Sequence, residues 1–237
     1  SKKRKKMKKT KSSKSFGREL TIQVKTARGR KISSTKWLQR QLNDPYVVAA
    51  RKAGLRSRAA FKLEELNDKF KFLNPNMNII ELGAAPGGWT QVLTKKLQTN
   101  KPQSKSRILA IDLIEMVPIA GAKLLKLDFT CDEAPSIISR EFNGKVDAVL
   151  SDMAPKITGH TNTDHIRTIN LVEAAFEFAI KILEPGGCFV SKVFQGGTEE
   201  VLLTKIKKLF SEVKHSKPPS SRKESAELYV IAKNFRP

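Results

Sequence analysis

The stretch "ELGAAPGGW" (residues 81–89) separates an apolar run, "MNII" (77–80), from "TQVLTKKL" (90–97), which has the pattern of a helix. Five of its nine residues are Gly or Ala, and Pro86 lies among them. Small residues between a buried strand and a helix leave room for another molecule to approach the backbone closely. We therefore interpret this segment, called the Gly loop below, as a ligand-binding turn.

Apolar runs of strand length alternate with helical patterns on either side of the Gly loop. The predicted strands are 78–82, 107–113, 122–127, 145–152 and 187–194. The predicted helices between them are 88–98, 132–141, 165–183 and 198–210. This alternation predicts an α/β fold with a mostly parallel sheet and helices on both of its faces. Two more strands, 212–217 and 226–233, are joined only by a polar loop, so we expect seven strands with the last one antiparallel.

A further helix is predicted directly before the sheet, at "LRSRAAFKLEELNDKF" (55–70). Its apolar residues recur at helical spacing, and a mixed charged face lies opposite them. Ser57 is the expected N-cap of this helix, because a serine oxygen can accept a hydrogen bond from a free amide of the first turn. The helix also carries Lys62.

The charge of the chain is strongly basic and unevenly distributed. There are 45 Lys and Arg residues against 23 Asp and Glu, a formal net charge of +22, which makes a polyanion the expected partner. Residues 1–36 hold 15 of the basic residues and one acid, Glu19. We expect residues 1–35 to be a largely disordered extension that binds RNA or DNA. The 39% hydrophobic content is enough for one sizeable domain, expected at residues 36–237.

Composition also argues against several classes of protein. No run of about 18 apolar residues occurs, and the basic segment 1–14 contains no apolar core of a signal peptide. We therefore expect no membrane association and a cytoplasmic location. Cys131, Cys188 and the three histidines show no metal-ligand spacing, so no metal is expected.

The glycines of the loop indicate the kind of ligand. Gly83, Gly87 and Gly88 follow the spacing G-x-x-x-G-G, which differs from the dinucleotide pattern G-x-G-x-x-G, and no G-K-[ST] phosphate loop follows. A small nucleoside-bearing ligand is therefore favoured over a pyrophosphate. Asp112, at the end of the second strand, could accept hydrogen bonds from both ribose hydroxyls. Asp128, after the third strand, could accept the adenine amino group, and this order of features is the one expected for S-adenosylmethionine (SAM).

Two lysines and two acids are expected to meet at the same edge of the sheet. Asp152 closes the fourth predicted strand and Lys192 the fifth. Glu227 opens the last strand, which reaches this edge if it runs antiparallel, and Lys62 comes from the preceding helix. Each residue alone has an ordinary explanation as a solvated or ion-paired side chain. Together with the Gly loop they predict a catalytic cleft.

At these residues the sequence resembles the FtsJ/RrmJ family of SAM-dependent ribosomal RNA ribose 2'-O-methyltransferases. The segments that carry the resemblance are "GLRSRAAFKL" (54–63), "ELGAAPGGW" (81–89), "SDMAP" (151–155), "LEPGGCFVSKVFQG" (183–196) and "SAELYVIA" (225–232). The resemblance extends over roughly residues 36–235. It implies a SAM-dependent methyltransferase (Rossmann-like) fold. Two features depart from the family: Glu81 stands where Asp is common, and the basic N-terminal extension is longer.

The resemblance also implies roles for individual residues. It places a catalytic tetrad at Lys62, Asp152, Lys192 and Glu227, with Lys192 as the base. From the sequence, the alternative that Lys192 is a charged residue that positions the hydroxyl stays open, and we favour the base. It places the cofactor site at Gly83, Ala84, Pro86, Gly87, Gly88, Trp89, Asp112, Leu113, Asp128, Phe129 and Asp152. The implied substrate is a uridine ribose in the A-loop of 23S-type rRNA within the large ribosomal subunit, methylated by a monomeric enzyme.

Other functions stay open from the sequence. The runner-up is 2'-O-methylation of another RNA, such as transfer RNA or a messenger cap, and a non-enzymatic alternative is a basic ribosome-assembly factor. A cytosine C5 methyltransferase is disfavoured because Ser151, Asp152 and Met153 stand where it needs a nucleophilic Cys. Arg56, Arg58, Lys156 and Lys192 are expected to form a positive rim for the phosphates beside the target ribose.

Overall fold

The computed structural model describes residues 32–142, 144–155, 161–194 and 199–237. The chain forms two compact units, residues 1–44 and 45–237. The described part of the first unit contains helix α1 (Ile32–Leu42). Most of the predicted basic extension, residues 1–35, falls outside the described residues, so that domain assignment stays a prediction.

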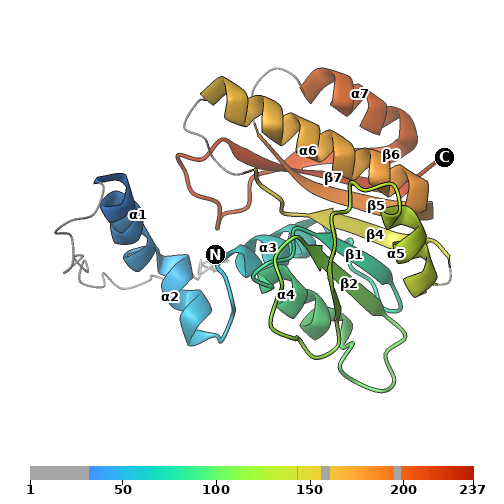
Figure 1. Ribbon diagram of the computed structural model, residues 1–237, viewed down its shortest axis with the longest axis horizontal. Coiled ribbons are helices and arrows are strands. Elements are labelled where there is room, and N and C mark those ends of the chain that lie inside the picture. The colour runs from blue at the N-terminus through green and yellow to red at the C-terminus, as the bar shows by residue number, and fades with distance from the viewer. Residues whose placement is uncertain (1–31, 143, 156–160, 195–198) are drawn as a thin grey trace, which may run out of the picture. The chain divides into compact units, whose positions relative to one another are not determined.

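The second unit is built on one seven-stranded sheet, in the order β3-β2-β1-β4-β5-β7-β6 (Figure 1). The strands are β1 (Asn78–Leu82), β2 (Arg107–Asp112), β3 (Lys123–Lys126), β4 (Val146–Ser151), β5 (Leu183–Phe194), β6 (Phe210–Ser216) and β7 (Glu227–Phe235). Strands β1 to β5 pair in parallel, whereas β7 lies antiparallel between β5 and β6. The predicted α/β fold, with its antiparallel last strand, is confirmed.

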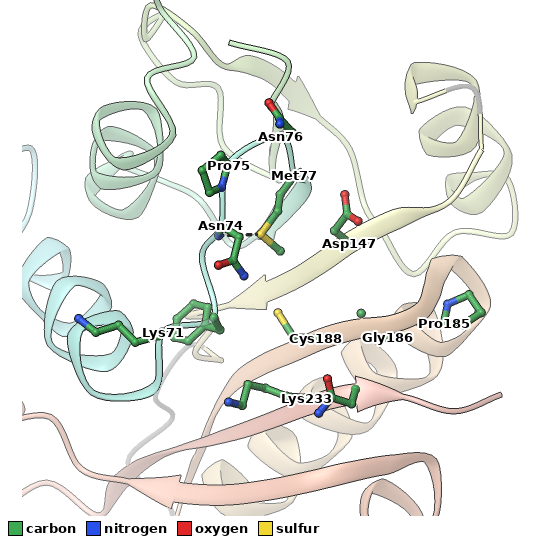
Figure 2. Close-up of a pocket in the computed structure, with 13 residues that line it drawn as sticks. Lys71, Asn74, Pro75, Asn76, Met77, Asp147, Pro185, Gly186, Cys188 and Lys233 are labelled. Atoms are coloured by element: carbon green, nitrogen blue, oxygen red, sulfur yellow. Dashed lines mark hydrogen bonds between the residues drawn. The ribbon is translucent and has the colours of Figure 1, made fainter.

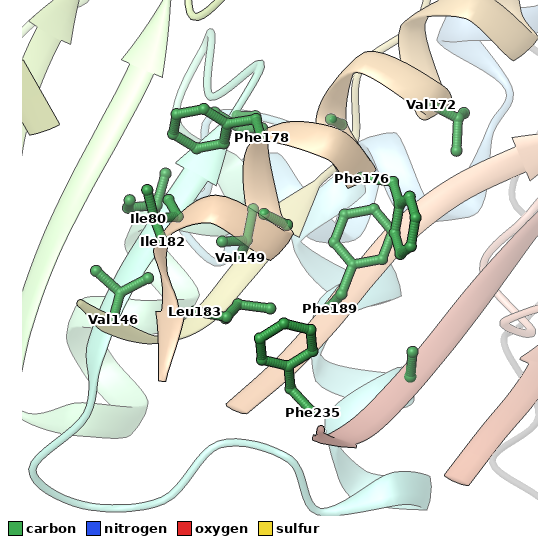
Figure 3. Packing of buried hydrophobic residues seen from close by; sticks show 14 of the residues in the cluster. Ile80, Val146, Val149, Val172, Phe176, Phe178, Ile182, Leu183, Phe189 and Phe235 are labelled. Atoms are coloured by element: carbon green, nitrogen blue, oxygen red, sulfur yellow. The ribbon is translucent and has the colours of Figure 1, made fainter. Parts of the chain in front are cut away.

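Helices cover both faces of the sheet, as expected (Figure 1). In this unit they are α2 (Pro45–Lys52), α3 (Ala59–Phe70), α4 (Gly88–Leu97), α5 (Ala134–Phe142), α6 (Thr161–Ile182) and α7 (Glu199–Leu209). Alternate strand residues divide the core in two, since successive side chains point to opposite faces. Ile80 and Val149 belong to a cluster with residues of α5, α6 and α7, and Figure 3 shows them with Phe178 and Ile182 of α6. Ile79 and Ala148 pack with α3 and α4. No helix in the described ranges is long and apolar enough to cross a membrane.

The start of α3 differs from the expectation. The helix begins at Ala59, and its N-cap residue is Arg58, which makes no side-chain capping bond. The prediction that Ser57 caps this helix is therefore wrong. The side chain of Ser57 instead packs against Gly88 at the start of α4, so closely that a Cβ atom on that glycine would collide with it. Close packing of α3 on α4 has taken precedence over the local capping preference.

Candidate active site

The four residues of the predicted tetrad meet at the edge where β1 to β5 end, which we call the carboxyl edge. Asp152 follows the last residue of β4, Lys192 lies near the end of β5, and Glu227 opens β7. Lys62 comes from the middle of α3. In the strands, Leu150, Val190 and Tyr229 pack on the α3–α4 face, so residues two positions away point toward the same face. Strand alternation thus brings Asp152, Lys192 and Glu227 toward Lys62.

The tetrad consists of two ion pairs. Lys192 Nζ lies 2.7 Å from the main-chain oxygen of Asp152 and 3.1 Å from its Oδ1. Lys62 Nζ lies 2.6 Å from Glu227 Oε1. The four side chains are 7% to 17% exposed, so each charge is largely removed from water and depends on its partner.

Tyr229 joins the two pairs, and sequence reasoning did not identify it. Its hydroxyl donates a 2.6 Å hydrogen bond to Asp152 Oδ1, and its ring centroid lies 5.9 Å from Lys62 Nζ. Burial, followed by the charges of Asp152 and Glu227, raises the pKa of Tyr229 well above its usual value, so the hydroxyl keeps its proton and acts as a donor. The available signal was position: Tyr229 lies two residues after Glu227 and is the cross-strand neighbour of Lys192.

A polar stripe on α3 secures the connection between β6 and β7. Residues 58, 62, 65 and 69 recur at helical spacing and therefore share one face. Arg58 Nη2 donates to the carbonyl of Ser220, and Glu65 Oε2 accepts both the amide (2.8 Å) and the hydroxyl (2.6 Å) of Ser220. Lys69 Nζ lies 3.2 Å from Ser216 Oγ. These contacts hold the start of β7 close to Lys62.

Ser221 completes this connection at the tetrad itself. Its hydroxyl donates a 2.8 Å hydrogen bond to Glu227 Oε1, the oxygen that also accepts from Lys62. Ser221 is only 6% exposed. The carboxylate of Glu227 is therefore oriented from two sides, by a helix and by a loop.

The Gly loop has the backbone that its sequence implies. Gly83 and Gly87 have φ values of 72° and 107°, which side chains rarely permit, and the Ala85–Pro86 peptide is cis. A Cβ atom on Gly83 would overlap Met153, and one on Gly87 would lie 2.7 Å from Ile119 Cδ1. The loop is thus tightly enclosed by the segments that follow β4 and β2.

Of the two predicted acids, Asp112 is hydrogen-bonded to this loop, whereas Asp128 follows β3. Asp112 Oδ2 accepts the Ala85 amide at 2.8 Å, and its Oδ1 accepts the Ile114 amide at 2.9 Å. Asp128 is exposed, and hydrogen bonds from the Thr130 side chain and amide lower its pKa, so it stays ionised and can only accept. Asp112 at the glycine-lined turn and Asp128 after β3 are acceptors that suit the hydroxyl and amino donors of an adenosine.

The other predicted cofactor residues include both exposed and buried side chains. Leu113 is 65% exposed beside Asp112 and offers an apolar surface, whereas Ala84 is buried. Trp89 is also buried; its Nε1 donates to the Ala59 carbonyl at 2.8 Å, and its ring lies 5.8 Å from that of Tyr229. Phe129 packs edge-on against Phe178 of α6. The structure therefore gives Trp89 and Phe129 contacts within the core.

Glu81 lies beneath the Gly loop and is only 2% exposed. The hydroxyl of Thr90 donates to its Oε2 at 2.6 Å. Burial, with smaller effects of Asp152 and Asp112, raises the pKa of Glu81 to about 8. The longer acid at this position is therefore accommodated in the neutral form at pH 7.

The expected phosphate rim is only partly described. Lys156 falls outside the described residues, and the guanidinium groups of Arg56 and Arg58 both donate to backbone carbonyls. In the described part of the chain, no cluster of His, Cys, Asp and Glu could hold a metal ion.

A cavity of about 470 Å³ lies at the opposite, amino edge of the sheet (Figure 2). Met77, Asp147, Cys188 and Lys233 are among its lining residues. Burial raises the pKa of Cys188 to about 12, so its thiol stays protonated. No member of the tetrad lines this cavity, and it is separated from the candidate site by the length of the strands.

The sheet order, the antiparallel β7, the glycine turn after β1 and the acids after β2 and β3 define a SAM-dependent methyltransferase fold. Comparison with known proteins agrees. The model of the FtsJ-like methyltransferase family matches residues 55–235, and the chain belongs to this family. Its methyl donor is SAM, whose adenosine the Gly loop, Asp112, Leu113 and Asp128 would hold.

Similar proteins include two named ribosomal RNA large subunit methyltransferase E. The one from Paramagnetospirillum magneticum is 53% identical over 219 residues, which cover 92% of this chain and 90% of the relative. The one from Rickettsia bellii is 52% identical over 213 residues, covering 90% and 94%. A crystal structure of a Plasmodium falciparum protein assigned as a ribosomal RNA methyltransferase aligns with a TM-score of 0.68 at 30% identity, covering 76% of this chain and 98% of that one.

Proposed function

We propose that this protein transfers the methyl group of SAM to the 2'-hydroxyl of a uridine ribose in the A-loop of 23S-type rRNA, within the large ribosomal subunit. The observation that carries the proposal is the pair of largely buried ion pairs, bridged by Tyr229, at the same edge as the Gly loop. The names of the relatives and the net charge of +22 support a ribosomal RNA substrate.

Lys192 is the proposed base. SAM supplies an electrophilic methyl group, so the protein has to align the hydroxyl and accept its proton as the new bond forms. To act as a base, Lys192 first has to release the proton of its ion pair with Asp152 to solvent, which leaves an amine with two N–H groups and one lone pair. Hydrogen bonds to the main-chain oxygen and Oδ1 of Asp152 use both N–H groups, which leaves the lone pair free to accept the proton of the ribose hydroxyl.

The other tetrad members orient the reacting groups. Asp152 fixes the direction of the Lys192 amine, and Tyr229 fixes Asp152. Lys62 and Glu227 form a second polar pair beside them, suited to hold the ribose and its neighbouring phosphate. No further group is needed to activate the methyl donor, since its sulfonium centre is already reactive.

The setting of the reaction is part of the same proposal. We expect the enzyme to act as a monomer in the cytoplasm, where it meets large subunits. Residues 1–35 would add non-specific RNA affinity through their basic side chains.

The test is transfer of a labelled methyl group from SAM to large subunits that lack the modification, followed by mapping of the labelled nucleotide. The proposal predicts one 2'-O-methyluridine in the A-loop. Labelled methyl groups in transfer RNA or a messenger cap would mean that another RNA is the substrate. Binding of large subunits with no methyl transfer would contradict the proposal that the protein is an enzyme.

A further inference from the structure

Arg56 connects two segments that flank the predicted cofactor site. Its Nη1 donates to the carbonyl of Val117 at 2.7 Å and to that of Pro86 at 3.3 Å. Its Nη2 donates to the carbonyl of Pro118 at 2.9 Å. Pro86 belongs to the Gly loop, whereas Val117 and Pro118 belong to the segment after β2, residues 113–122, which we call the β2–β3 segment.

The main chain of Arg56 is held by the side chain of Gln91, which helps to fix the position of the guanidinium group. The Arg56 amide donates to Gln91 Oε1 at 2.7 Å, and Gln91 Nε2 donates to the Gly54 carbonyl at 3.1 Å. The group lies so close to Gly87 that a Cβ atom on that glycine would be 3.1 Å from Arg56 Nη1. A planar guanidinium with several N–H donors can hold carbonyls of two segments at once, which a lysine amine does less well.

The β2–β3 segment has few other attachments that could hold it over the Gly loop. Leu113, Ile114 and Val117 are 65% to 73% exposed. Besides the Arg56 hydrogen bonds, the segment has the Asp112–Ile114 hydrogen bond and the packing of Ile119 on Gly87, and its end is anchored where Gly121 approaches Thr99 and Asn100 and Ala122 packs on the α3–α4 core. Since residues 113–118 have little buried surface of their own and could open easily, their closed position depends on the Arg56 hydrogen bonds.

We propose that Arg56 is a positioning residue for the methyl donor: it holds the β2–β3 segment against the Gly loop and thereby sets the affinity for SAM. This assignment differs from the phosphate contact that the sequence suggests for Arg56, and it rests on the proposed use of SAM. An arginine whose donors face backbone carbonyls of two segments has little left to offer an RNA phosphate.

The test is SAM binding to the full chain by calorimetry, for the wild type and Arg56→Gln. If the closed fraction of the segment falls to about one tenth, the apparent Kd for SAM rises about 10-fold. Binding of an A-loop RNA hairpin, followed against salt, is expected to keep its slope. Arg51→Gln removes the same charge from an exposed site on α2 and is expected to leave the SAM affinity unchanged.

Hydrogen exchange provides a readout that does not depend on turnover. In the absence of SAM, Arg56→Gln is expected to speed exchange in residues 113–122 while α4 stays protected. The exchange rate of this segment in Arg56→Lys is expected to lie between those of the wild type and Arg56→Gln. This measurement also decides the matter if Arg56→Gln proves too unstable for calorimetry.

Two results would overturn the inference. One is a SAM affinity in Arg56→Gln within twofold of the wild type, with a salt slope reduced by about one charge, which identifies a phosphate contact. The other is unchanged exchange in the β2–β3 segment of both variants. If the wild type itself fails to bind SAM, the proposed function fails. If the wild type binds SAM and Arg56→Gln binds it equally well, only the inference about Arg56 fails.

Discussion

The two edges of the sheet differ in how they hold their charged side chains. At the carboxyl edge, two lysines and two acids are paired, 7% to 17% exposed, and connected through Tyr229. At the amino edge, Lys71 is exposed, and the pair of Lys233 with Glu212 is 24% and 36% exposed. The amino edge also has a cavity, of about 470 Å³. A hollow alone does not identify a functional site, whereas buried, mutually dependent charges favour the carboxyl edge.

The largest expected effect is that of Lys192→Ala at the carboxyl edge. Loss of the proposed base is expected to lower kcat by roughly 10²- to 10⁴-fold, while the Kd for SAM, measured by calorimetry, changes little. Lys205→Ala is the matched control, because it removes the lysine of an exposed ion pair with Glu173 on the molecular surface. A near wild-type rate in Lys192→Ala would remove this residue from the mechanism.

The pH dependence of stability provides a second comparison of the two edges, through the buried groups Glu81 and Cys188. Folding raises the pKa of Glu81 from 4.5 to about 8, so its contribution to stability is fully present below pH 4.5 and is lost as pH rises to about 8. Relative to Glu81→Gln, the wild type is expected to lose roughly 4 kcal/mol at most between pH 5 and pH 9. Urea unfolding at both pH values measures this, and an equal difference at both would contradict it.

Cys188 at the amino edge provides the contrast, since its pKa of about 12 lies outside this pH range. Cys188→Ser is therefore expected to change stability by nearly the same amount at pH 5 and at pH 9, within about 0.5 kcal/mol, because the unfolded thiol, with a pKa of 9.0, is only beginning to ionise at pH 9. A difference several times larger would show that the amino edge also holds a group that titrates near neutrality.

Tyr229→Phe removes only the hydroxyl that fixes Asp152. A hydrogen bond to a charged group is worth about 1.5–3 kcal/mol, so kcat is expected to fall roughly 10- to 100-fold. The ring and its packing on Trp89 remain, so the melting temperature and the SAM affinity should change far less. An unaltered kcat would mean that Asp152 needs no such support.

Ser221→Ala leaves Glu227 held by Lys62 alone. The lost hydrogen bond also goes to a carboxylate, but Lys62 still holds the same oxygen, so kcat is expected to fall about 10-fold, at the lower end of the range for Tyr229→Phe, with the KM for SAM unchanged. Ser225→Ala is a useful comparison, because that hydroxyl accepts from the Glu227 amide and leaves the carboxylate untouched. Equal losses in the two variants would argue for a general effect on the loop.

The smallest effect is expected at the amino edge. Lys71→Gln changes an exposed residue beside the cavity and is expected to leave kcat and both KM values within twofold of the wild type. Steady-state kinetics with large subunits checks this. A clear loss of activity would mean that the amino edge takes part in substrate binding and that the contrast between the edges is weaker than the geometry suggests.

Much of this fold could be predicted from the sequence because strand and helix periods are local properties. The same alternation placed Asp152, Lys192 and Glu227 at one edge, since residues at the ends of parallel strands must meet there. Which lysine pairs with which acid depends on side-chain reach across α3 and β7, and no local pattern encodes that. Tyr229 was missed because a tyrosine within "ELYVIA" has the appearance of an ordinary core residue.

Tertiary packing explains the wrong prediction for Ser57 and bears on the predicted phosphate rim, which stays a prediction. Ser57 has the chemistry of a cap but is committed to the close approach of α3 and α4. Arg56 and Arg58 have the chemistry of phosphate ligands, yet their donors face carbonyls of loops distant in the sequence. The sequence therefore predicts which polar side chains lie near a site more readily than it predicts which groups those side chains contact.

The most direct test of the central claim is a crystal structure of the complex with S-adenosylhomocysteine, the demethylated product of the donor. We predict that the adenosine lies on the Gly loop between Asp112 and Asp128 and that its sulfur lies on the side of Asp152 and Lys192. Product bound in the cavity at the amino edge, or a complex in which Lys62, Asp152, Lys192 and Glu227 lie apart from the ligand, would contradict this account.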